Sequence, residues 1–259
     1  MAYTERNELR YEKRGPTAYL TLNRPEAMNA LNTALREAIN DAIADGESDD
    51  RILSFVIAGE GGKAFCAGAD LKEMTRRDSE GDVGRGPLDS AVATCTKPVI
   101  AAIDGFCLAG GLELALRCDI RIATEKSTFG LPEPRRSLLA GYGLHNLSRM
   151  VPLGEALHMQ LTGSPITSQR AYEIGLIQRR VADRAALIKE VDAVTGEIAL
   201  CAPLAVTAIK TIVKTGRNLP VEYSIKLAEP IHKAINATED RLEGPKAFAE
   251  KRKPNWKMR

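Results

Sequence analysis

The sequence lacks the cysteine pattern of a disulfide-stapled or zinc-binding protein. No two cysteines form a Cys-x-x-Cys pair, and their number, five, is odd. We therefore expect free thiols, as in a reducing cytoplasm, and neither a disulfide framework nor a zinc ribbon. The cysteines are Cys66, Cys95, Cys107, Cys118 and Cys201.

Histidines and long apolar runs are also scarce. His145, His158 and His232 lie far apart without metal-ligand spacing, so no metal site is expected. No apolar run approaches the ~20 residues of a membrane span. The beginning, Met-Ala-Tyr-Thr-Glu-Arg, shows no signal-peptide pattern. The expected location is cytoplasmic.

An excess of either charge is missing as well. The chain has 36 basic and 34 acidic residues, a net charge of +2, which predicts no general attraction to nucleic acids or membranes. The segment from Lys246 to Arg259 is basic, but Glu250 and Trp256 interrupt it. A solvated helix end is a simpler interpretation of this segment than a nucleic-acid contact.

The composition present is that of an ordinary globular protein. The 259 residues are 44% hydrophobic and 27% charged, which suits one large domain, with or without a subdomain. Patterns of strands at 17–22, 52–58, 98–103 and 120–123 alternate with helical spacing at 29–43 and after Gly110, separated by turns such as Asp45-Gly46. This alternation predicts an α/β layered domain.

After Leu153 the pattern turns mainly helical. Residues 75–90 are polar and indicate either a surface loop or a lid over a site. The expected C-terminal helices are 154–161, 168–174, 185–200, 203–215, 220–238 and 246–252.

A pair of glycines and a glutamate open the helix after residue 109. Gly110 and Gly111 would let a ligand approach backbone N–H groups, and the helix start favours an anionic oxygen there. Glu113 then lies in the first turn, where a carboxylate suits catalysis better than a core. The simpler interpretation is that Glu113 complements the helix dipole and pairs with Arg117 at i, i+4.

A second carboxylate lies in a turn with restricted backbone. Glu133 stands between Pro132 and Pro134 and offers a partner for acid–base chemistry. The simpler interpretation is a surface turn in which Glu133 pairs with Arg135 or Arg136.

The small residues of 67–70 form another turn, which either bares a backbone N–H or merely connects a strand to a helix. It is no phosphate loop, because no Gly-Lys-Ser/Thr follows, and no G-x-G-x-x-G follows the first strand. A G-x-S-x-G nucleophile elbow is absent too.

These motifs, in this order, resemble the enoyl-CoA hydratase/isomerase (crotonase) superfamily over nearly the whole chain. The glycine-rich block and the Phe-Gly-x-Pro-Glu block are specific as an ordered set. The matching segments are Leu22–Pro25, Phe65–Met74, Lys97–Gly105, Gly110–Ala115, Cys118–Ile120, Phe129–Glu133, Leu161–Gly163 and Phe248–Arg252.

The resemblance implies an α/β fold: a crotonase-like spiral of β-β-α units over residues 1–197 and a C-terminal helical trimerisation part over 198–259. It also implies an acyl-CoA substrate, a homotrimer or a hexamer (dimer of trimers), and no cofactor, coenzyme A being part of the substrate.

The family's site residues carry over by motif. Ala69 and Gly110 match the backbone N–H groups that hold the thioester oxygen, and Glu113 and Glu133 match the two glutamates of the hydratases. The implied substrate-binding residues are Ala67, Ala69, Asp70, Leu71, Lys72, Gly110, Gly141 and Tyr142.

Keeping both glutamates favours reversible hydration of 2-enoyl-CoA thioesters, as in fatty acid metabolism, because many isomerising, hydrolysing or decarboxylating relatives lack one or both. Three alternatives stay open. The first is double-bond isomerisation by Glu133 alone. The second is dehydration of a polar acyl-CoA such as carnitinyl-CoA, to whose dehydratase the ending 243–256 is similar. The third is a protein that only binds acyl-CoA or nucleic acid.

The chain departs from the family pattern after the second glutamate. Arg135 and Arg136 stand where apolar residues are usual, and Tyr142 stands where a small residue is common. Gly141 and Gly143 are kept, but the usual proline is not. These changes lie beside the expected acyl pocket, so Tyr142 should narrow it or offer it a hydroxyl group.

Overall fold

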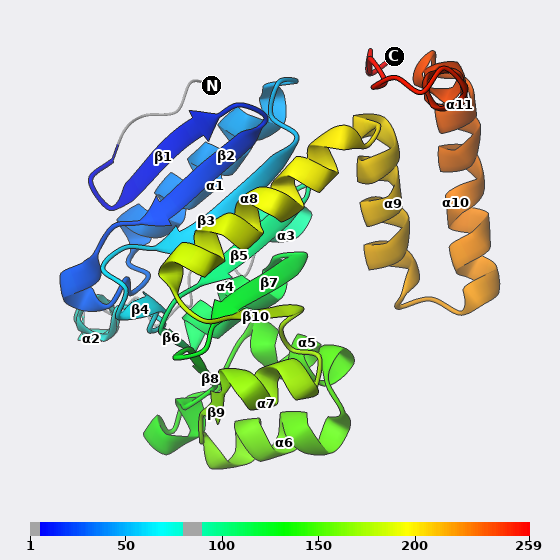
Figure 1. Cartoon of the computed structure of the whole chain (residues 1–259). Helices are drawn as coiled ribbons and strands as arrows, with labels where there is room; N and C mark the ends of the chain where they lie inside the picture. The colour runs from blue at the N-terminus through cyan, green and yellow to red at the C-terminus, as the bar shows by residue number, and fades with distance from the viewer. Residues whose placement is uncertain (1–5, 80–89) are drawn as a thin grey trace. The chain divides into compact units, whose positions relative to one another are not determined.

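Two β-sheets form the body of the N-terminal part in the computed structural model, which describes residues 6–79 and 90–259 (Figure 1). The six-stranded sheet has the order β1-β2-β3-β5-β7-β10, and the four-stranded sheet has the order β4-β6-β8-β9. The strands are β1 (Leu9–Arg14), β2 (Thr17–Leu22), β3 (Ser54–Gly59), β4 (Ala64–Cys66), β5 (Val99–Ile103), β6 (Phe106–Leu108), β7 (Ile120–Thr124), β8 (Thr128–Gly130), β9 (Ile166–Thr167) and β10 (Arg179–Val181).

Helices follow the strands and then dominate the C-terminal third. Two short 3-10 turns, η1 and η2, complete the described elements. The helical elements are η1 (Pro25–Ala27), α1 (Thr33–Ser48), α2 (Leu71–Ser79), α3 (Ala91–Thr94), α4 (Gly110–Arg117), η2 (Glu133–Arg136), α5 (Tyr142–Met150), α6 (Leu153–Thr162), α7 (Ser168–Glu173), α8 (Arg184–Leu200), α9 (Pro203–Gly216), α10 (Val221–Asn236) and α11 (Asp240–Ala249).

From β3 to β8, successive strands alternate between the two sheets. β3, β5 and β7 are parallel neighbours in the large sheet, and the strands that follow them, β4, β6 and β8, are parallel neighbours in the small one. A helical element follows each pair: α2, α4 and η2 with α5. The chain thus winds through repeated β-β-α units, and the expected mixed α/β fold is confirmed.

The central strands are apolar because both faces of the large sheet are covered. All five residues of β5 are buried, as are Phe55, Val56 and Ile57 of β3. The helix α1 packs against β1 and β2 with one face, which carries Leu35, Ile39 and Ile43. The strands predicted over 17–22, 52–58, 98–103 and 120–123 are therefore confirmed.

The bounds of α1 correct the sequence-based expectation at both ends. The helix begins after Asn32, whose side chain accepts a hydrogen bond from Leu35 N, rather than at Asn29. The predicted turn at Asp45-Gly46 is wrong, because α1 continues to Ser48. Gly46 is needed there for packing: a Cβ at this position would come within 2.4 Å of the Phe55 ring.

Other boundaries also differ from the expectation. Pro245 lies inside α11 instead of opening a helix at Lys246, since α11 already begins at Asp240. The short strands β4, β6 and β8 were not predicted, because three residues are too few for a periodic pattern. Of the expected loop or lid over 75–90, residues 80–89 lie outside the described part of the chain.

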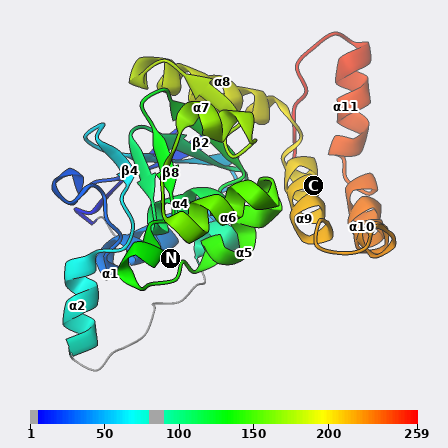
Figure 2. The same ribbon diagram turned by 90° about the horizontal axis from the view of Figure 1, so that it is seen from below.

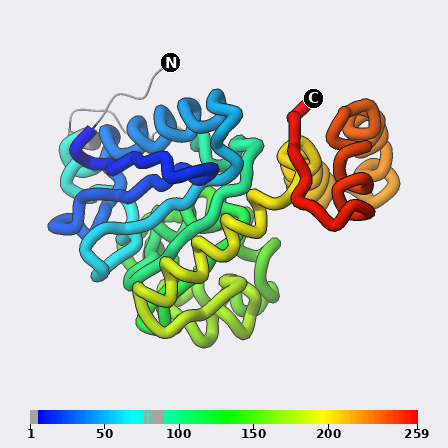
Figure 3. The backbone as a smooth tube through the Cα atoms, turned by 45° about the horizontal axis from the view of Figure 1, so that its top comes forward, coloured from blue at the N-terminus to red at the C-terminus, as the bar shows by residue number. Residues whose placement is uncertain are grey.

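The chain divides into two compact units within α8. The first comprises residues up to Cys95 with Val99–Asp192, and the second comprises Thr96–Pro98 with Ala193–Arg259. In the second unit α9 and α10 lie side by side, and the C-terminal tail returns toward the start of α9 (Figure 1 and Figure 3). Trp256 Nε1 fixes this tail by donating to Leu200 O at 3.1 Å.

Two further findings concern the whole described chain. Four of the five cysteines are buried, whereas Cys201 is exposed, and burial raises the pKa of the Cys66 thiol to about 11. Within residues 6–79 and 90–259, no single helix meets the length and hydropathy needed to cross a membrane, although α8 and α9 meet them together as a bent pair.

Candidate active site

The carboxyl ends of β4, β6 and β8 lie at one edge of the small sheet, because these three strands are parallel. Ala69 follows β4, Gly110 follows β6 and Glu133 follows β8. This edge is where parallel α/β sheets usually bind ligands. The sheet topology therefore delivers three of the predicted site residues to one region of the first unit.

The turn after β4 pairs with Leu31 in a way that leaves the N–H of Ala69 without a partner in the backbone bridge. Leu31 N donates to Gly68 O at 2.8 Å, and Asp70 N donates to Leu31 O at 3.2 Å. These two bonds hold the residues on either side of Ala69, so the N–H of Ala69 stays outside the bridge. Among the described residues it donates to no acceptor.

Asp70 anchors this turn. Its Oδ2 accepts from Arg24 Nη2 at 2.8 Å, and its Oδ1 accepts from Lys72 N at 3.1 Å at the start of α2. Burial opposes ionisation of Asp70, but these bonds and that from Glu73 N outweigh it and hold the pKa of Asp70 below its ordinary value. Asp70 thus fixes the loop, while Leu71 and Lys72 lie exposed next to it.

The start of α4 approaches the same point through a strained residue. Ala109 has φ 51° and ψ −129°, a conformation rare for residues with a Cβ, and its N–H donates to Gly130 O at 2.9 Å. Gly110 N, in the first turn of α4, has no intrahelical acceptor. It donates to none of the described residues.

Three glycines let the two backbone segments approach closely. A Cβ on Gly110 would lie 3.4 Å from Ala69 N. A Cβ on Gly111 would come within 2.1 Å of Cys66 O, and one on Gly68, where φ is +114°, within 2.7 Å of Ala109 Cβ. The N–H groups of Ala69 and Gly110 thus belong to neighbouring segments, as two donors to one ligand oxygen must.

The side chain of Glu113 is held in place by α5, the helix that follows β7, β8 and η2. Its Oε1 accepts from Gly143 N, in the first turn of α5, at 2.8 Å. Figure 2 shows α4, α5 and α6 gathered on one side of the first unit. Gly143 must be small here, because its Cβ would lie 2.9 Å from Leu131 Cδ1 and 3.5 Å from Glu113 Cγ.

Arg117 lies behind Glu113 on the same helix. Arg117 Nη1 donates at 3.0 Å to the backbone carbonyl oxygen of Glu113, whereas the alternative interpretation of Glu113 expected an ion pair between the two side chains. The guanidinium stacks on the Tyr142 ring, 4.3 Å from its centroid. Burial lowers the pKa of Arg117 from its ordinary value, although Glu113 and Tyr142 oppose this shift.

Glu133 begins the 3-10 turn η2, with Pro132 before it and Pro134 after it. Its Oε2 is shielded from solvent and accepts no hydrogen bond from the described residues, although Glu133 makes other contacts. The alternative interpretation paired Glu133 with Arg135 or Arg136, but the Arg135 guanidinium donates to Thr162 O at 2.9 Å and to Ser164 Oγ at 2.8 Å.

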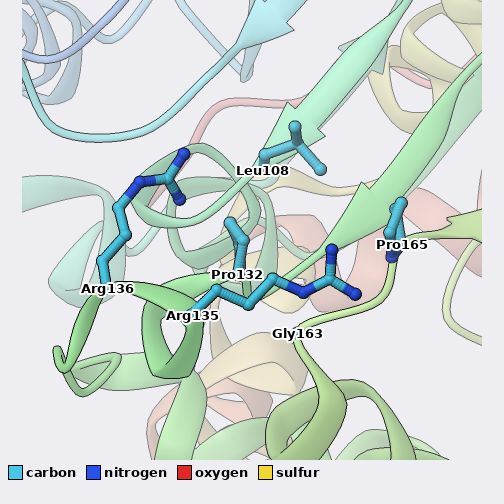
Figure 4. A pocket seen from close by; sticks show the side chains of 6 residues that line it. All are labelled: Leu108, Pro132, Arg135, Arg136, Gly163 and Pro165. Atoms are coloured by element: carbon cyan, nitrogen blue, oxygen red, sulfur yellow. The ribbon is translucent and has the colours of Figure 1, made fainter.

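A hollow of about 270 Å³ opens at η2, two residues of which line it (Figure 4). Its walls carry two arginines and no acidic side chain. The residues that line it are Leu108, Pro132, Arg135, Arg136, Gly163 and Pro165.

Tyr142, expected at the acyl pocket, is not among the residues that line this hollow. It begins α5, directly after Gly141, the N-cap residue of that helix.

Sequence reasoning missed three residues of this site. The support of Glu113 by Gly143 joins two helices distant in sequence, and only the retained glycine hinted at it. Arg117 was the one basic residue in an apolar helix, a signal that could have marked it as buried with a role. The bond of Arg24 to Asp70 gave no sequence signal at all.

No group of three or more His, Cys, Asp or Glu in the described residues is arranged to hold a metal ion.

Comparisons with known proteins show what the chain is similar to. The family model described as enoyl-CoA hydratase/isomerase matches residues 12–259. The chain is 37% identical over 254 residues to (E)-benzylidenesuccinyl-CoA hydratase of Thauera aromatica, covering 93% of this chain and 95% of that protein. It is 34% identical to short-chain-enoyl-CoA hydratase of Clostridium acetobutylicum, covering 96% of this chain and 97% of that protein.

Solved structures show the same likeness. The crystal structure of an enoyl-CoA hydratase from Mycobacterium tuberculosis superposes on this chain with a TM-score of 0.90 at 34% identity. The match covers 98% of this chain and 100% of that chain. From the match across residues 12–259 and from these relatives, it follows that the chain belongs to the enoyl-CoA hydratase/isomerase family of the crotonase superfamily.

Proposed function

We propose that the protein is an enoyl-CoA hydratase, which adds water reversibly to 2-enoyl-CoA thioesters and forms 3-hydroxyacyl-CoA. The observation that carries this proposal is the orientation of Glu113 by Gly143 N beside two backbone N–H groups with no acceptor among the described residues. The names of the relatives, which include short-chain-enoyl-CoA hydratase and crotonyl-CoA hydratase, support it.

The proposed oxyanion hole consists of Ala69 N–H and Gly110 N–H. In hydration, negative charge develops on the thioester oxygen as water attacks Cβ. Two N–H groups fixed in neighbouring turns stabilise that charge without reorganising, and one such donor is typically worth about 3 kcal/mol.

The proposed acid–base pair is Glu113 and Glu133. Glu113 keeps Oε1 on Gly143 N and uses Oε2 to take a proton from the attacking water. The double-bond electrons move to the thioester oxygen, and Glu133 gives a proton to Cα as the enolate collapses. One molecule of water is added in total, and proton exchange returns both carboxyl groups to their starting states. This reaction requires no metal or redox cofactor.

The remaining predicted residues are proposed to hold the substrate. The turn 67–72 and the start of α4 would bind the thioester end, and the start of α5 would face the acyl end. The proposed set is Ala67, Ala69, Asp70, Leu71, Lys72, Gly110, Gly141 and Tyr142.

Isomerisation by Glu133 alone is a second candidate. It would leave Glu113 without a role, although Gly143 N holds that carboxylate in one orientation. The position of the double bond or hydroxyl group in the product distinguishes the two reactions.

We further propose that the protein assembles as a homotrimer, or as a hexamer built from two trimers. Large apolar side chains of the second unit are exposed in the single chain, which suits burial against other copies. They include Ile209, Val213, Val221, Tyr223, Ile225, Leu242 and Phe248.

Glu113→Gln and Glu133→Gln test the proposed function. Each should lower kcat on crotonyl-CoA by at least ~100-fold, because general acid–base catalysis contributes about that much, while acetyl-CoA still binds. Glu173→Gln, an exposed control on α7, should keep the wild-type rate. Near-wild-type turnover by either active-site variant would remove that glutamate from the mechanism.

A further inference from the structure

The side chains that line the hollow at η2 carry charge of one sign only. Arg135 and Arg136 follow Glu133 within η2, whereas the other lining residues are apolar or glycine. Leu108 comes just before Ala109 and Gly110, so the hollow lies on the β6–β8 side of the candidate site. A ligand group that enters it would meet two cations and no carboxylate from the lining residues.

The two arginines are not equivalent. The guanidinium of Arg135 already makes hydrogen bonds within the protein, since it donates to Thr162 O and Ser164 Oγ. Arg136 makes no hydrogen bond or ion pair with the residues that the structure describes. Figure 4 shows the two side chains diverging, with Arg135 extended toward Gly163 and Pro165. Arg136 is therefore the cation free to bind a ligand.

We propose that the preferred substrate carries a carboxylate at the far end of its acyl group, and that Arg136 binds this carboxylate. The substrate class is then the 2-enoyl-CoA thioester of a dicarboxylic acid. This inference rests on the proposed function, because it takes Glu133 as the residue that protonates Cα. The planar guanidinium of Arg136 offers the paired N–H donors that suit a carboxylate.

The coenzyme A phosphates are the other anions that Arg136 could meet. The turn proposed to hold the thioester end follows β4, whereas η2 follows β8, across β6 in the small sheet. The acyl group extends from Cα away from the sulfur, so a residue next to Glu133 is better placed for the acyl end. The two sources are separable by experiment.

The test compares two matched thioesters. Glutaconyl-CoA ends in a carboxylate, and its neutral analogue carries an isopropyl group in the same place. Hydrogen bonds to a charged group typically discriminate by roughly 10- to 100-fold, so wild-type kcat/KM should favour glutaconyl-CoA by that factor. In Arg136→Met the ratio of the two kcat/KM values should fall toward one, and Arg136→Lys should keep part of it.

Two controls decide how a failure is interpreted. Arg149→Met, on neighbouring α5, should keep the wild-type ratio. Calorimetry with acetyl-CoA should give the same Kd for wild type and Arg136→Met, and a loss of about 10-fold there would assign Arg136 to the coenzyme A phosphates and overturn the inference. Wild-type turnover of both thioesters without preference would overturn the inference alone, whereas turnover of neither would overturn the hydratase proposal and the inference with it.

Discussion

Ala109 shows how a single residue is strained where the candidate oxyanion hole is formed. Its φ of 51° and ψ of −129° are unfavourable for any residue with a Cβ, and such conformations cost of order 1–3 kcal/mol. The bond from Ala109 N to Gly130 O and the helix that follows hold it there. The strain fixes the direction of the next N–H, that of Gly110.

Ala109→Gly should therefore stabilise the protein. Glycine adopts this conformation without strain, and its greater freedom in the unfolded chain costs only about 0.4–1 kcal/mol. We expect the free energy of unfolding in urea to rise by ~1 kcal/mol. The control Ala140→Gly, at a buried position without positive φ, should instead lower it. A lower stability of Ala109→Gly would mean that its methyl group contributes more by packing than its backbone costs.

Single residues also show what the sequence could predict. Glu113 and Glu133 were recognisable because carboxylates next to paired glycines or prolines are unusual in a core. The contact of Glu113 with Gly143, the burial of Arg117 and the anchoring of Arg135 depend on how distant segments pack. No local pattern encodes such contacts, so they became visible only in the structure.

At the scale of elements, α4 packs so closely against β4 that only glycine fits at the point of contact. Gly111 lies so close to this strand that a Cβ would come within 2.1 Å of Cys66 O and 2.7 Å of Cys66 C. Backbone atoms cannot rotate away as a flexible side chain can. The approach of α4 to β4, and with it the neighbourhood of Gly110 and Ala69, depends on this glycine.

Gly111→Ala should destabilise the protein, and the matched change Gly154→Ala in α6 should not. A Cβ at Gly154 meets no atom within 4 Å, so alanine there should gain up to about 1 kcal/mol of helix propensity. Thermal unfolding of both variants measures the difference. Equal melting temperatures would show that α4 can shift away from β4 at little cost.

The C-terminal tail makes a pH-sensitive connection to α11. Glu243 accepts from Arg252 Nη1 at 2.6 Å, Arg252 Nη2 at 2.9 Å and Asn255 N at 2.7 Å. The Arg252 bonds, and then that of Asn255, lower the pKa of Glu243 from 4.5 to about 2. Because the pKa of Glu243 is lower in the folded than in the unfolded chain, its carboxylate stabilises the fold fully at pH values above 4.5. This contribution is lost as the pH falls from 4.5 toward 2.

Glu243→Gln should therefore lower the melting temperature at neutral pH, and the difference from wild type should shrink as the pH falls through this window. Arg252→Met should cause a similar loss at neutral pH, and the double variant should add little to it. A difference from wild type that does not change with pH would contradict this role for the Glu243 carboxylate.

Element boundaries were predictable where a periodic pattern was long. The strands β2, β3, β5 and β7 of the large sheet and the body of α1 followed from apolar spacing. The ends of α1 did not, because the cap at Asn32 and the packing of Gly46 on Phe55 overrode the apparent turn. The strands β4, β6 and β8 were too short to show a period, although their ends carry the site.

At the scale of the whole molecule, the resemblance to a family assigned roles to the two glutamates and to both backbone donors, which composition and spacing left undecided, and these roles stay predictions. Ile209 and Val213 are 61% and 59% exposed and lie four positions apart, on one face of α9. Such a face is expected to pack against another copy.

Light scattering at micromolar concentration should give a mass of three or six chains. Ile209→Asp should weaken the assembly, because it would bury a charge, while Thr211→Asp, on the opposite face of α9, should not. A monomeric wild-type protein would contradict the proposed trimer.

The single exposed cysteine, Cys201, allows the native protein to be labelled at one position without mutagenesis. A maleimide dye should react with Cys201, whereas the four buried thiols, of which Cys66 has a pKa of about 11, should be protected until the chain unfolds. Every assembled particle would then carry one fluorophore per subunit at a defined point of its second unit. The loss of fluorescence anisotropy by energy transfer between identical dyes would count subunits and follow their exchange in real time.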